Sequence, residues 1–219
     1  MRSELAARDI RLLQIRAADG GAVLCFTVAY NDGEGLCKRP LYAFAARLAR
    51  LPEVGALDAA LYELLCREDE VYRAMTQGLR ALSGSDPSAA QLRHKLRAGG
   101  FSAEITEEVL EALEARGYID EVRGALCACE RELKKLRGDR RILAELRAKG
   151  FGDAGLAAVR ERLAGENGAA RCRTLLRKKR ITAPEDPKEL QKLIAALVRY
   201  GYTSAEIRTA LQIELEDFE

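Results

Sequence analysis

A pattern of ten residues occurs three times in this chain of 219 residues. In each copy, two aliphatic residues four positions apart are followed by a glycine and then by an aromatic residue. The glycines are 50 and 51 residues apart. The three copies are Leu92–Phe101, Ile142–Phe151 and Leu193–Tyr202. Such a period is typical of tandem repeats, whose units bury their apolar faces on one another.

The glycine of each copy indicates the end of a short helix. Glycine is favoured just after a helix because it adopts the left-handed conformation without a Cβ penalty. We expect the following aromatic residue to fold back onto the helix that has ended. Two serines shortly after these aromatics, Ser102 and Ser204, are expected to cap a further helix. Each unit therefore reads as a helix, a loop, a short helix, a tight turn and a third helix.

The predicted fold is mainly α: three tandem three-helix repeats form an elongated curved array, preceded by a small N-terminal β-hairpin or sheet element. The predicted domains are residues 1–57 for the β-rich element with a short helix, 58–117 for repeat 1, 118–165 for repeat 2 and 166–219 for repeat 3. Asp58 is a candidate N-cap for the first helix of repeat 1.

Helical periodicity also predicts which side chains face the core. In repeat 1 the expected apolar stripe is Tyr72, Met75, Leu79 and Leu82. In repeat 2 it is Val122, Leu126, Cys129, Leu133 and Leu136. The last helix is expected to continue its stripe through Leu211 and Leu215.

The first 57 residues have a different pattern. A turn at Asp19–Gly21 precedes a run rich in β-branched and aromatic residues over 22–30, and Asn31–Gly35 reads as a second turn. We expect strands on both sides of the first turn, a third strand near Leu36–Pro40 and a short helix over 42–50.

Composition excludes several classes of protein. Hydrophobic residues make up 48% and charged residues 32% of the chain, which does not fit a disordered segment. No run approaches the ~20 apolar residues that a membrane span needs. The charged residues 1–9 contain no apolar signal-peptide core. The sequence therefore predicts a cytoplasmic protein.

No group of residues predicts catalysis, a metal or a cofactor. His94 is the only histidine and lies between Arg93 and Lys95, where we expect it to be solvated. The close pair Cys127 and Cys129 lacks the C-x-x-C spacing of zinc and redox sites. We expect the six cysteines to be reduced, with Cys129 and Cys172 in the core. There is also no phosphate-binding glycine-rich loop.

Charge is concentrated in one block. Residues 131–180 hold 16 Lys and Arg against 6 Asp and Glu, although the whole chain has a net charge of only +2. Such a block suggests a polyanionic partner, and a solvated Arg-rich surface is the alternative interpretation. The candidate binding residues are Lys134, Lys135, Arg137, Arg140, Arg141, Arg147, Lys149, Arg171, Arg173, Arg177, Lys178, Lys179 and Arg180.

Periodicity predicts the orientation of these cations. Cys172, Leu175 and Leu176 should face the core of repeat 3, which would turn Arg171, Thr174, Arg177 and Lys178 to solvent. Ile142 and Leu146 should face the core of repeat 2, leaving Arg140, Arg141, Arg147 and Lys149 at the surface or at helix ends.

Residues 58–219 resemble the RecX family. The resemblance rests on the three units, on the pattern Leu92–Phe101, and on the segments Leu113–Asp120, Arg140–Gly150 and Leu176–Arg180. An N-terminal β-element before the repeats is also like this family. The chain departs from the family in two places: the linker Asp120–Ala125 lacks an aromatic residue, and Gly138-Asp139 replaces a Gly-Pro pair.

The resemblance implies a regulator that binds the RecA filament on single-stranded DNA and modulates it, most often by inhibition, in DNA repair, recombination and the SOS response. We also expect no enzymatic activity, no cofactor and a monomer. The partners would be the recombinase filament and single-stranded DNA, the latter through phosphate contacts that do not depend on sequence.

Two other functions fit the sequence less well. A helix-turn-helix regulator would place one helix of a unit in the major groove, but the third helix of repeat 1 presents Glu104, Glu107, Glu108 and Glu111 and no arginine. An enzyme has no candidate site.

Overall fold

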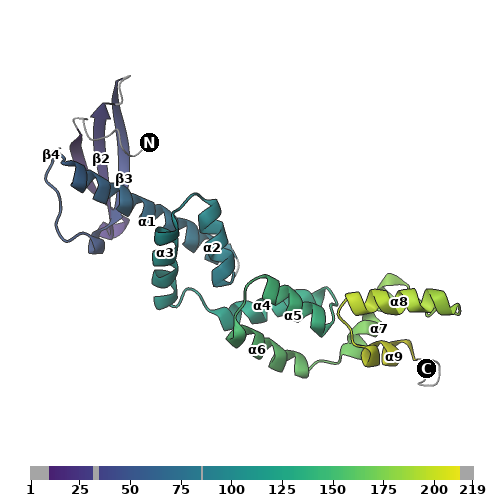
Figure 1. Ribbon diagram of the computed structural model, residues 1–219. Helices are drawn as coiled ribbons and strands as arrows, with labels where there is room; N and C mark the ends of the chain where they lie inside the picture. The colour runs from purple at the N-terminus through teal and green to yellow at the C-terminus, as the bar shows by residue number, and fades with distance from the viewer. Residues whose placement is uncertain (1–9, 32–34, 85, 213–219) are drawn as a thin grey trace. The chain divides into compact units, whose positions relative to one another are not determined.

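The computed structural model describes residues 10–31, 35–84 and 86–212. The turn expected at Asn31–Gly35 lies partly outside the described residues, and the apolar position expected at Leu215 lies wholly outside them. The chain divides into two compact units, one formed by residues 1–80 with 95–113 and the other by residues 81–94 with 114–219. We call them the first and the second unit. Figure 1 shows the order of the elements.

A four-stranded antiparallel sheet lies at the N-terminal end of the first unit. Its spatial order is β3-β2-β1-β4. The strands are β1 (Arg11–Ala18), β2 (Val23–Asn31), β3 (Leu36–Phe44) and β4 (Gly55–Ala56). The predicted turn is confirmed as a single 3₁₀ turn, Asp19–Gly21, in which Gly20 and Gly21 have φ of 63° and 93°.

The helix predicted over 42–50 is wrong. Strand β3 continues to Phe44, because Tyr42 pairs with Cys25 and Phe44 pairs with Val23 along the whole of β2. Only a 3₁₀ turn, Ala45–Arg47, remains of the expected helix. The short strand β4 was not predicted, and it is held by pairing with the start of β1. Strand pairing outweighs local helix propensity here.

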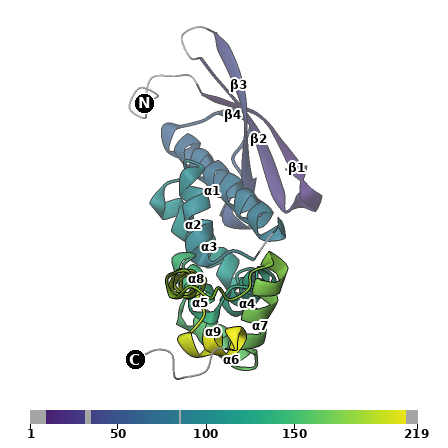
Figure 2. The same cartoon turned by 90° about the vertical axis from the view of Figure 1, so that its right-hand side faces the viewer.

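Helix α1 (Ala59–Gly84) packs on the sheet, as both views show (Figures 1 and 2). Asp58 caps it, as expected, by accepting the N–H of Leu61 at 2.7 Å. Tyr62 and Leu65 enter a core that also contains Phe26. Asp69 accepts the backbone N–H of Tyr42 at 3.0 Å, so the helix satisfies a backbone group of the outer strand β3.

Nine α-helices follow one another in the part of the chain that the structure describes, in agreement with the predicted mainly α class. After α1 they are α2 (Ala89–Ala98), α3 (Ala103–Ala115), α4 (Glu121–Lys134), α5 (Asp139–Ala148), α6 (Asp153–Ala164), α7 (Gly168–Lys179), α8 (Pro187–Arg199) and α9 (Ser204–Leu211). We refer to α1–α3, α4–α6 and α7–α9 as repeats 1, 2 and 3.

Repeats 2 and 3 each contain a core that matches much of the prediction. Ile142 and Leu146 of α5 are fully buried beside Cys129 of α4. Cys172, Leu175 and Leu176 of α7 are buried in the core of repeat 3. The cores also hold Leu156, Val159 and Leu163 in repeat 2 and Leu197, Tyr202 and Ile207 in repeat 3.

The predicted stripe of α4 is rotated from the observed one. Val122 is 40% exposed, whereas Ala125 and Ala128 are buried. A Cβ at Gly155 of α6 would lie 3.0 Å from the Cβ of Ala125, so the two helices approach through small residues. In α1, likewise, Leu79 is exposed and Gly78 is buried close to Leu113 of α3. In both helices the face with small residues is buried, because it allows close packing, and longer aliphatic side chains next to it stay exposed.

The predicted helix ends are confirmed in all three repeats. Gly100, Gly150 and Gly201 have φ of 89°, 77° and 103°. The following aromatic N–H returns to the carbonyl of the aliphatic residue five positions earlier, for example from Tyr202 to Leu197 at 3.2 Å. This is the Schellman pattern.

The two predicted serine caps differ in outcome. Ser102 accepts the N–H of Ile105 at 3.2 Å, as expected. Ser204 is instead the first residue of α9, and Thr203 caps that helix in a capping box with Glu206. The β-conformation of Thr203 allows this reciprocal pair, which satisfies two backbone donors instead of one.

Within the second unit, the short helices of successive repeats meet end to end. The Lys149 carbonyl at the end of α5 accepts a hydrogen bond from the Ser88 hydroxyl before α2, at 2.5 Å. At the equivalent place one repeat later, the Tyr200 carbonyl accepts the N–H of Gly138 before α5, at 3.0 Å. The Gly201 carbonyl accepts the N–H of Arg140 at 3.2 Å. Carbonyls at one helix end thus satisfy donors at the start of another.

This end-to-end packing predicts unequal costs for two glycine substitutions in the second unit. Gly117→Ala meets open space at φ of 70°, so it should cost only the left-handed strain, about 1–2 kcal/mol. Gly201→Ala places a Cβ 2.4 Å from the Cβ of Arg141 and 2.7 Å from the Gly138 carbonyl oxygen. It should cost about 1–3 kcal/mol more because of the clash. Urea denaturation compares the two variants, and equal costs would contradict the packing described.

Candidate functional site

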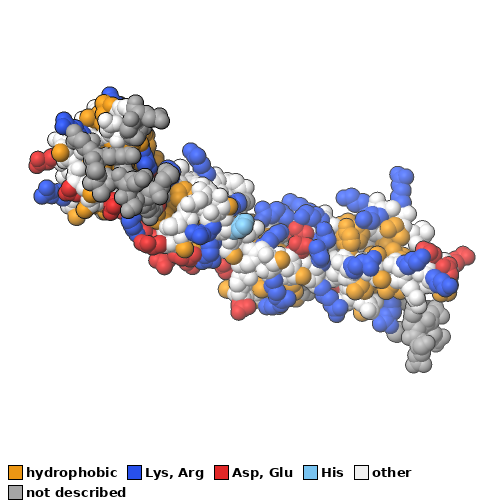
Figure 3. Space-filling view, turned by 45° about the horizontal axis from the view of Figure 1, so that its top comes forward, with side chains coloured by type: hydrophobic (Ala, Val, Ile, Leu, Met, Phe, Trp, Pro, Cys, Tyr) orange, Lys and Arg blue, Asp and Glu red, His pale blue; other side chains and the backbone are white. Residues whose placement is uncertain are grey.

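All thirteen candidate cations belong to the second unit. They come from the end of α4 and the loop after it, from α5 with its C-cap, and from α7 with its C-cap. Figure 3 shows Lys and Arg side chains, in blue, gathered over the helices of repeats 2 and 3. The structure thus places the charged block on two neighbouring repeats.

Six of the candidates are exposed and make no ion pair with any residue that the structure describes. They are Lys134, Arg140, Arg147, Arg177, Lys178 and Arg180. Arg173 is also exposed, and its guanidinium donates to the Thr209 carbonyl at 3.3 Å. Arg141 forms an ion pair with Glu145 of the same helix at 2.5 Å. No described carboxylate forms an ion pair with these six cations, so they add positive charge to the surface of the second unit.

Arg171 does not face solvent, contrary to the prediction from α7. Its side chain is 6% exposed and forms ion pairs with Asp139 at the start of α5 and with Glu166. The prediction considered the periodicity of α7 alone. In the structure the neighbouring repeat covers this side of α7 and buries Arg171. Burial raises the pKa of Asp139 even though the Arg171 charge opposes the shift. Arg171 therefore joins repeats 2 and 3 and is not available to a partner.

A second group of candidates converges on one buried carboxylate, Glu132 of α4. Its Oε1 lies 2.7 Å from the Nζ of Lys135 and 3.6 Å from that of Lys149, and its Oε2 lies 3.9 Å from the Nε of Arg137. Burial would raise the pKa of Glu132, but the hydrogen bond from Lys135 and the charges of all three cations outweigh it and lower the pKa.

Glu132 is not among the residues that the sequence predicted. Its position four residues after the buried Ala128 is the signal that could have identified it, because it continues the small-residue face of α4. A carboxylate on that face needs cations around it.

An aromatic ring connects Arg137 with one further candidate, Lys179, from the next repeat. The Arg137 Cζ lies 5.0 Å and the Lys179 Nζ 5.2 Å from the centroid of the Tyr200 ring. Tyr200 is half-buried at the end of α8, and its carbonyl accepts the N–H of Gly138. Both cations are thus held by cation–π contacts at the junction of repeats 2 and 3.

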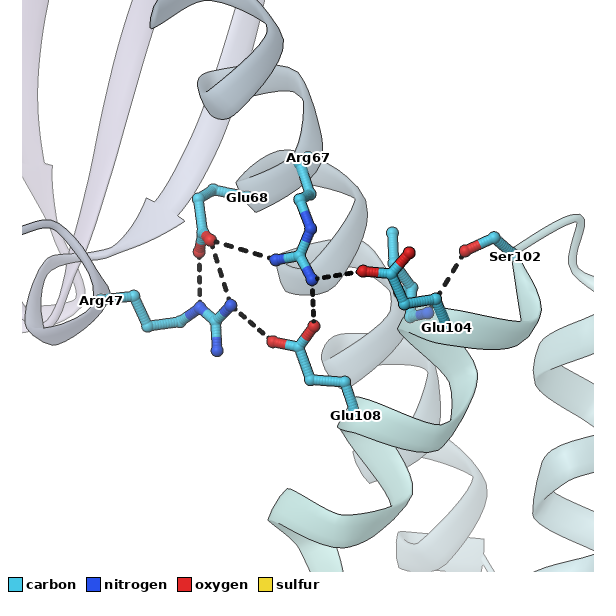
Figure 4. A network of polar contacts seen from close by, with 7 residues as sticks. Arg47, Arg67, Glu68, Ser102, Glu104 and Glu108 are labelled. Carbon is cyan, nitrogen blue, oxygen red and sulfur yellow. Dashed lines mark hydrogen bonds and ion pairs between the residues drawn. The ribbon is translucent and has the colours of Figure 1, made fainter.

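A polar network of the first unit has a different character (Figure 4). Arg47 after β3 contacts Glu68 of α1 and Glu108 of α3, both at 2.5 Å. Arg67 contacts Glu104 at 2.9 Å and Glu108 at 2.8 Å. These contacts raise the pKa of Arg47, the hydrogen bond with Glu68 contributing most. The network fastens the sheet, α1 and α3 together, and its charges are paired.

Metal and thiol chemistry finds no support among the described residues. No group of three or more His, Cys, Asp or Glu side chains there could hold a metal ion. Burial raises the pKa of both Cys129 and Cys172 to about 11, which keeps these thiols protonated and unreactive near neutral pH. His94 is exposed, as expected. Over the same residues, no helix has the length and apolar character required to cross a bilayer.

These features define a helical-repeat protein with a cationic surface. Family models agree: residues 74–113 match the first three-helix domain of RecX, and residues 166–211 match the third. Regulatory protein RecX from Pelodictyon phaeoclathratiforme is 32% identical over 143 residues, which cover 64% of this chain and 88% of that protein. The protein of the same name from Halorhodospira halophila gives the same identity and coverage. The chain belongs to the RecX family.

Solved structures support the same fold. A crystal structure of regulatory protein RecX aligns with a TM-score of 0.67 at 20% identity, over 94% of this chain and all of that one. RecX from Lactobacillus salivarius aligns with a TM-score of 0.55 at 18% identity, over 66% of this chain and 96% of that one. The resemblance seen in the sequence is confirmed.

The lowered pKa of Glu132 predicts a pH-dependent loss of stability in Glu132→Gln. The ionised carboxylate stabilises the folded state above its ordinary pKa of 4.5, and this stabilisation disappears as the pH falls through the lower folded value. At pH 7 the variant should lose about 1.5–3 kcal/mol, the usual contribution of hydrogen bonds to a charged group.

Urea denaturation at pH 7 and at a pH well below 4.5 provides the measurement. The gap between wild type and Glu132→Gln should narrow in acid. Glu161→Gln, an exposed substitution on α6, is the control and should stay close to wild type at both values. A gap that is the same at both pH values would contradict the charged role of Glu132.

Proposed function

We propose that this protein regulates the RecA filament on single-stranded DNA and does so by inhibition, in recombination and repair. Membership of a family whose relatives are named regulatory proteins supports a regulatory role. The observation that carries the proposal is the set of exposed cations on repeats 2 and 3 that form no ion pair with a described residue, among them Arg147, Arg177 and Lys178. A filament on DNA offers anions along its length.

Two kinds of anion fit this surface. DNA phosphates and acidic side chains of the recombinase would both pair with Lys and Arg. Contacts to DNA would be independent of sequence, since the cluster has no Asn or Gln arranged to read base edges. Such a protein acts as a monomeric binding module without a catalytic step, in the cytoplasm where the filament forms.

The three-helix units do not act as stand-alone major-groove readers in this proposal. The acidic residues of α3 that would have to enter the groove are already committed to the first unit, because Glu104 and Glu108 bind Arg67. A recognition helix that presents carboxylates to a phosphate-lined groove would be repelled.

A charge-reversal variant tests the proposal. The variant combines Arg147→Glu, Arg177→Glu and Lys178→Glu. It should inhibit the recombinase ATPase less than the wild type does, and recombinase filaments on single-stranded DNA should be longer in its presence than with the wild type. If the partner is DNA, the log–log dependence of affinity on salt should become shallower by about 0.7 for each phosphate that the variant no longer neutralises. Arg171 is left unchanged because it is buried and paired with Asp139, so its substitution would affect folding as well as binding.

The control is the reversal of Arg16, Lys38 and Arg50, three exposed cations of the first unit. It changes net charge by the same amount and should inhibit like wild type. If the first variant keeps its helical circular dichroism spectrum and still inhibits at the wild-type concentration, the basic surface is not the interface.

A further inference from the structure

At the junction of repeats 2 and 3, the side chains around Glu132 and Tyr200 include more cations than carboxylates. Lys135, Arg137 and Lys149 surround the single carboxylate of Glu132. Lys179 approaches from the other repeat, on the ring of Tyr200. Three cations therefore share one buried carboxylate. Arg137 also lies on the Tyr200 ring together with Lys179.

The Tyr200 ring attracts Arg137 and Lys179 without adding a negative charge, unlike a carboxylate. A carboxylate that held Arg137 and Lys179 would cancel part of their charge, whereas an aromatic face attracts them and leaves the full charge in place. The backbone that carries the ring is fixed, since the carbonyl of Tyr200 accepts the N–H of Gly138. The neighbouring Tyr202 hydroxyl donates to the Leu136 carbonyl at 2.7 Å and fixes the start of the same loop.

The result is a cationic site whose members are positioned before any partner arrives. Long, flexible side chains normally lose conformational freedom when they bind an anion, and holding them in place beforehand reduces that cost. The Arg140 backbone is at the same junction, bonded to the Gly201 carbonyl, and its exposed side chain adds a further cation.

Phosphodiester groups fit this site better than protein carboxylates do. Three of the four cations are lysines, which bind phosphate as point charges without requiring the planar bidentate geometry of a carboxylate pair. The exposed cations on α5 and α7 continue the charge away from the junction, as a linear polyanion requires.

We propose that the junction of repeats 2 and 3 is a preorganised site for the phosphodiester groups of a single nucleic-acid strand, and that Tyr200 is its positioning residue. This inference rests on the proposed function only in that a filament on DNA supplies such a strand. Neither Glu132 nor Tyr200 contacts the strand in this arrangement; they set the places of the cations that do.

The test measures binding of a fluorescently labelled oligo(dT) to the full chain by anisotropy over a series of salt concentrations. Tyr200→Leu should weaken binding about tenfold, because it removes the ring that holds Arg137 and Lys179 in place. Tyr200→Phe keeps the ring and should bind within about twofold of wild type. Tyr118→Leu removes an exposed tyrosine outside the junction and is the matched control, with unchanged binding.

A double-mutant comparison separates positioning from folding. Arg137→Gln with Lys179→Gln should weaken binding on its own, and adding Tyr200→Leu to that pair should weaken it no further. Wild-type affinity in Tyr200→Leu or in the Arg137→Gln/Lys179→Gln pair would overturn the proposal. So would equal weakening by Tyr200→Phe and Tyr200→Leu, because it would assign the effect to the hydroxyl.

Competition with poly-glutamate identifies the class of partner. Displacement of oligo(dT) by poly-glutamate at an equal concentration of charges would contradict a phosphodiester site and indicate an acidic protein surface. The two proposals also fail separately. A wild-type chain that inhibits the filament but does not bind oligo(dT) overturns this inference alone, whereas Tyr200-dependent binding without inhibition overturns the proposed function alone.

Discussion

The second unit depends on hydrogen bonds from the start of one short helix to the carbonyl end of the next. A helix end leaves carbonyls without intrahelical partners, and a helix start leaves N–H groups in the same condition. Here Gly138 and Arg140 supply the donors that Tyr200 and Gly201 require, and Ser88 does the same for Lys149. The opposite partial charges of the two helix ends also attract each other. The contact leaves no room for a side chain at Gly150 or Gly201, where a Cβ would lie 2.4 Å from the Cβ of Ala90 or of Arg141.

The same contact determines where charge is placed. The residue before the repeat glycine gives its carbonyl to the preceding repeat, and its side chain remains free to act elsewhere. At that position repeat 2 has Lys149, which joins the cations around Glu132. Repeat 3 has Tyr200, whose ring holds Arg137 and Lys179. The same position therefore supplies a cation in repeat 2 and the ring that holds two cations in repeat 3.

The sequence predicted features that depend on local backbone chemistry. Gly150 and Gly201 end their helices as expected, and the apolar spacing of Cys172 and Leu176 placed them correctly in the core. Features that depend on a neighbouring element were not predicted. Tyr42 joins a strand because β2 pairs with it, and Arg171 is buried because α5 supplies Asp139. The roles of Glu132 and Tyr200 were not predicted either, since they come from cations brought in by other helices.

Amide hydrogen exchange at Gly138 and Arg140 tests the end-to-end contact most directly. Both residues lie at the start of α5, where an N–H has no partner within its own helix and would exchange rapidly in an isolated repeat. Bonded to the carbonyls of Tyr200 and Gly201, these amides should exchange as slowly as the interior of α5 and α8, through unfolding of the unit as a whole. Exchange at the fast rate of a frayed helix end, while the interiors of both helices remain protected, would contradict the account.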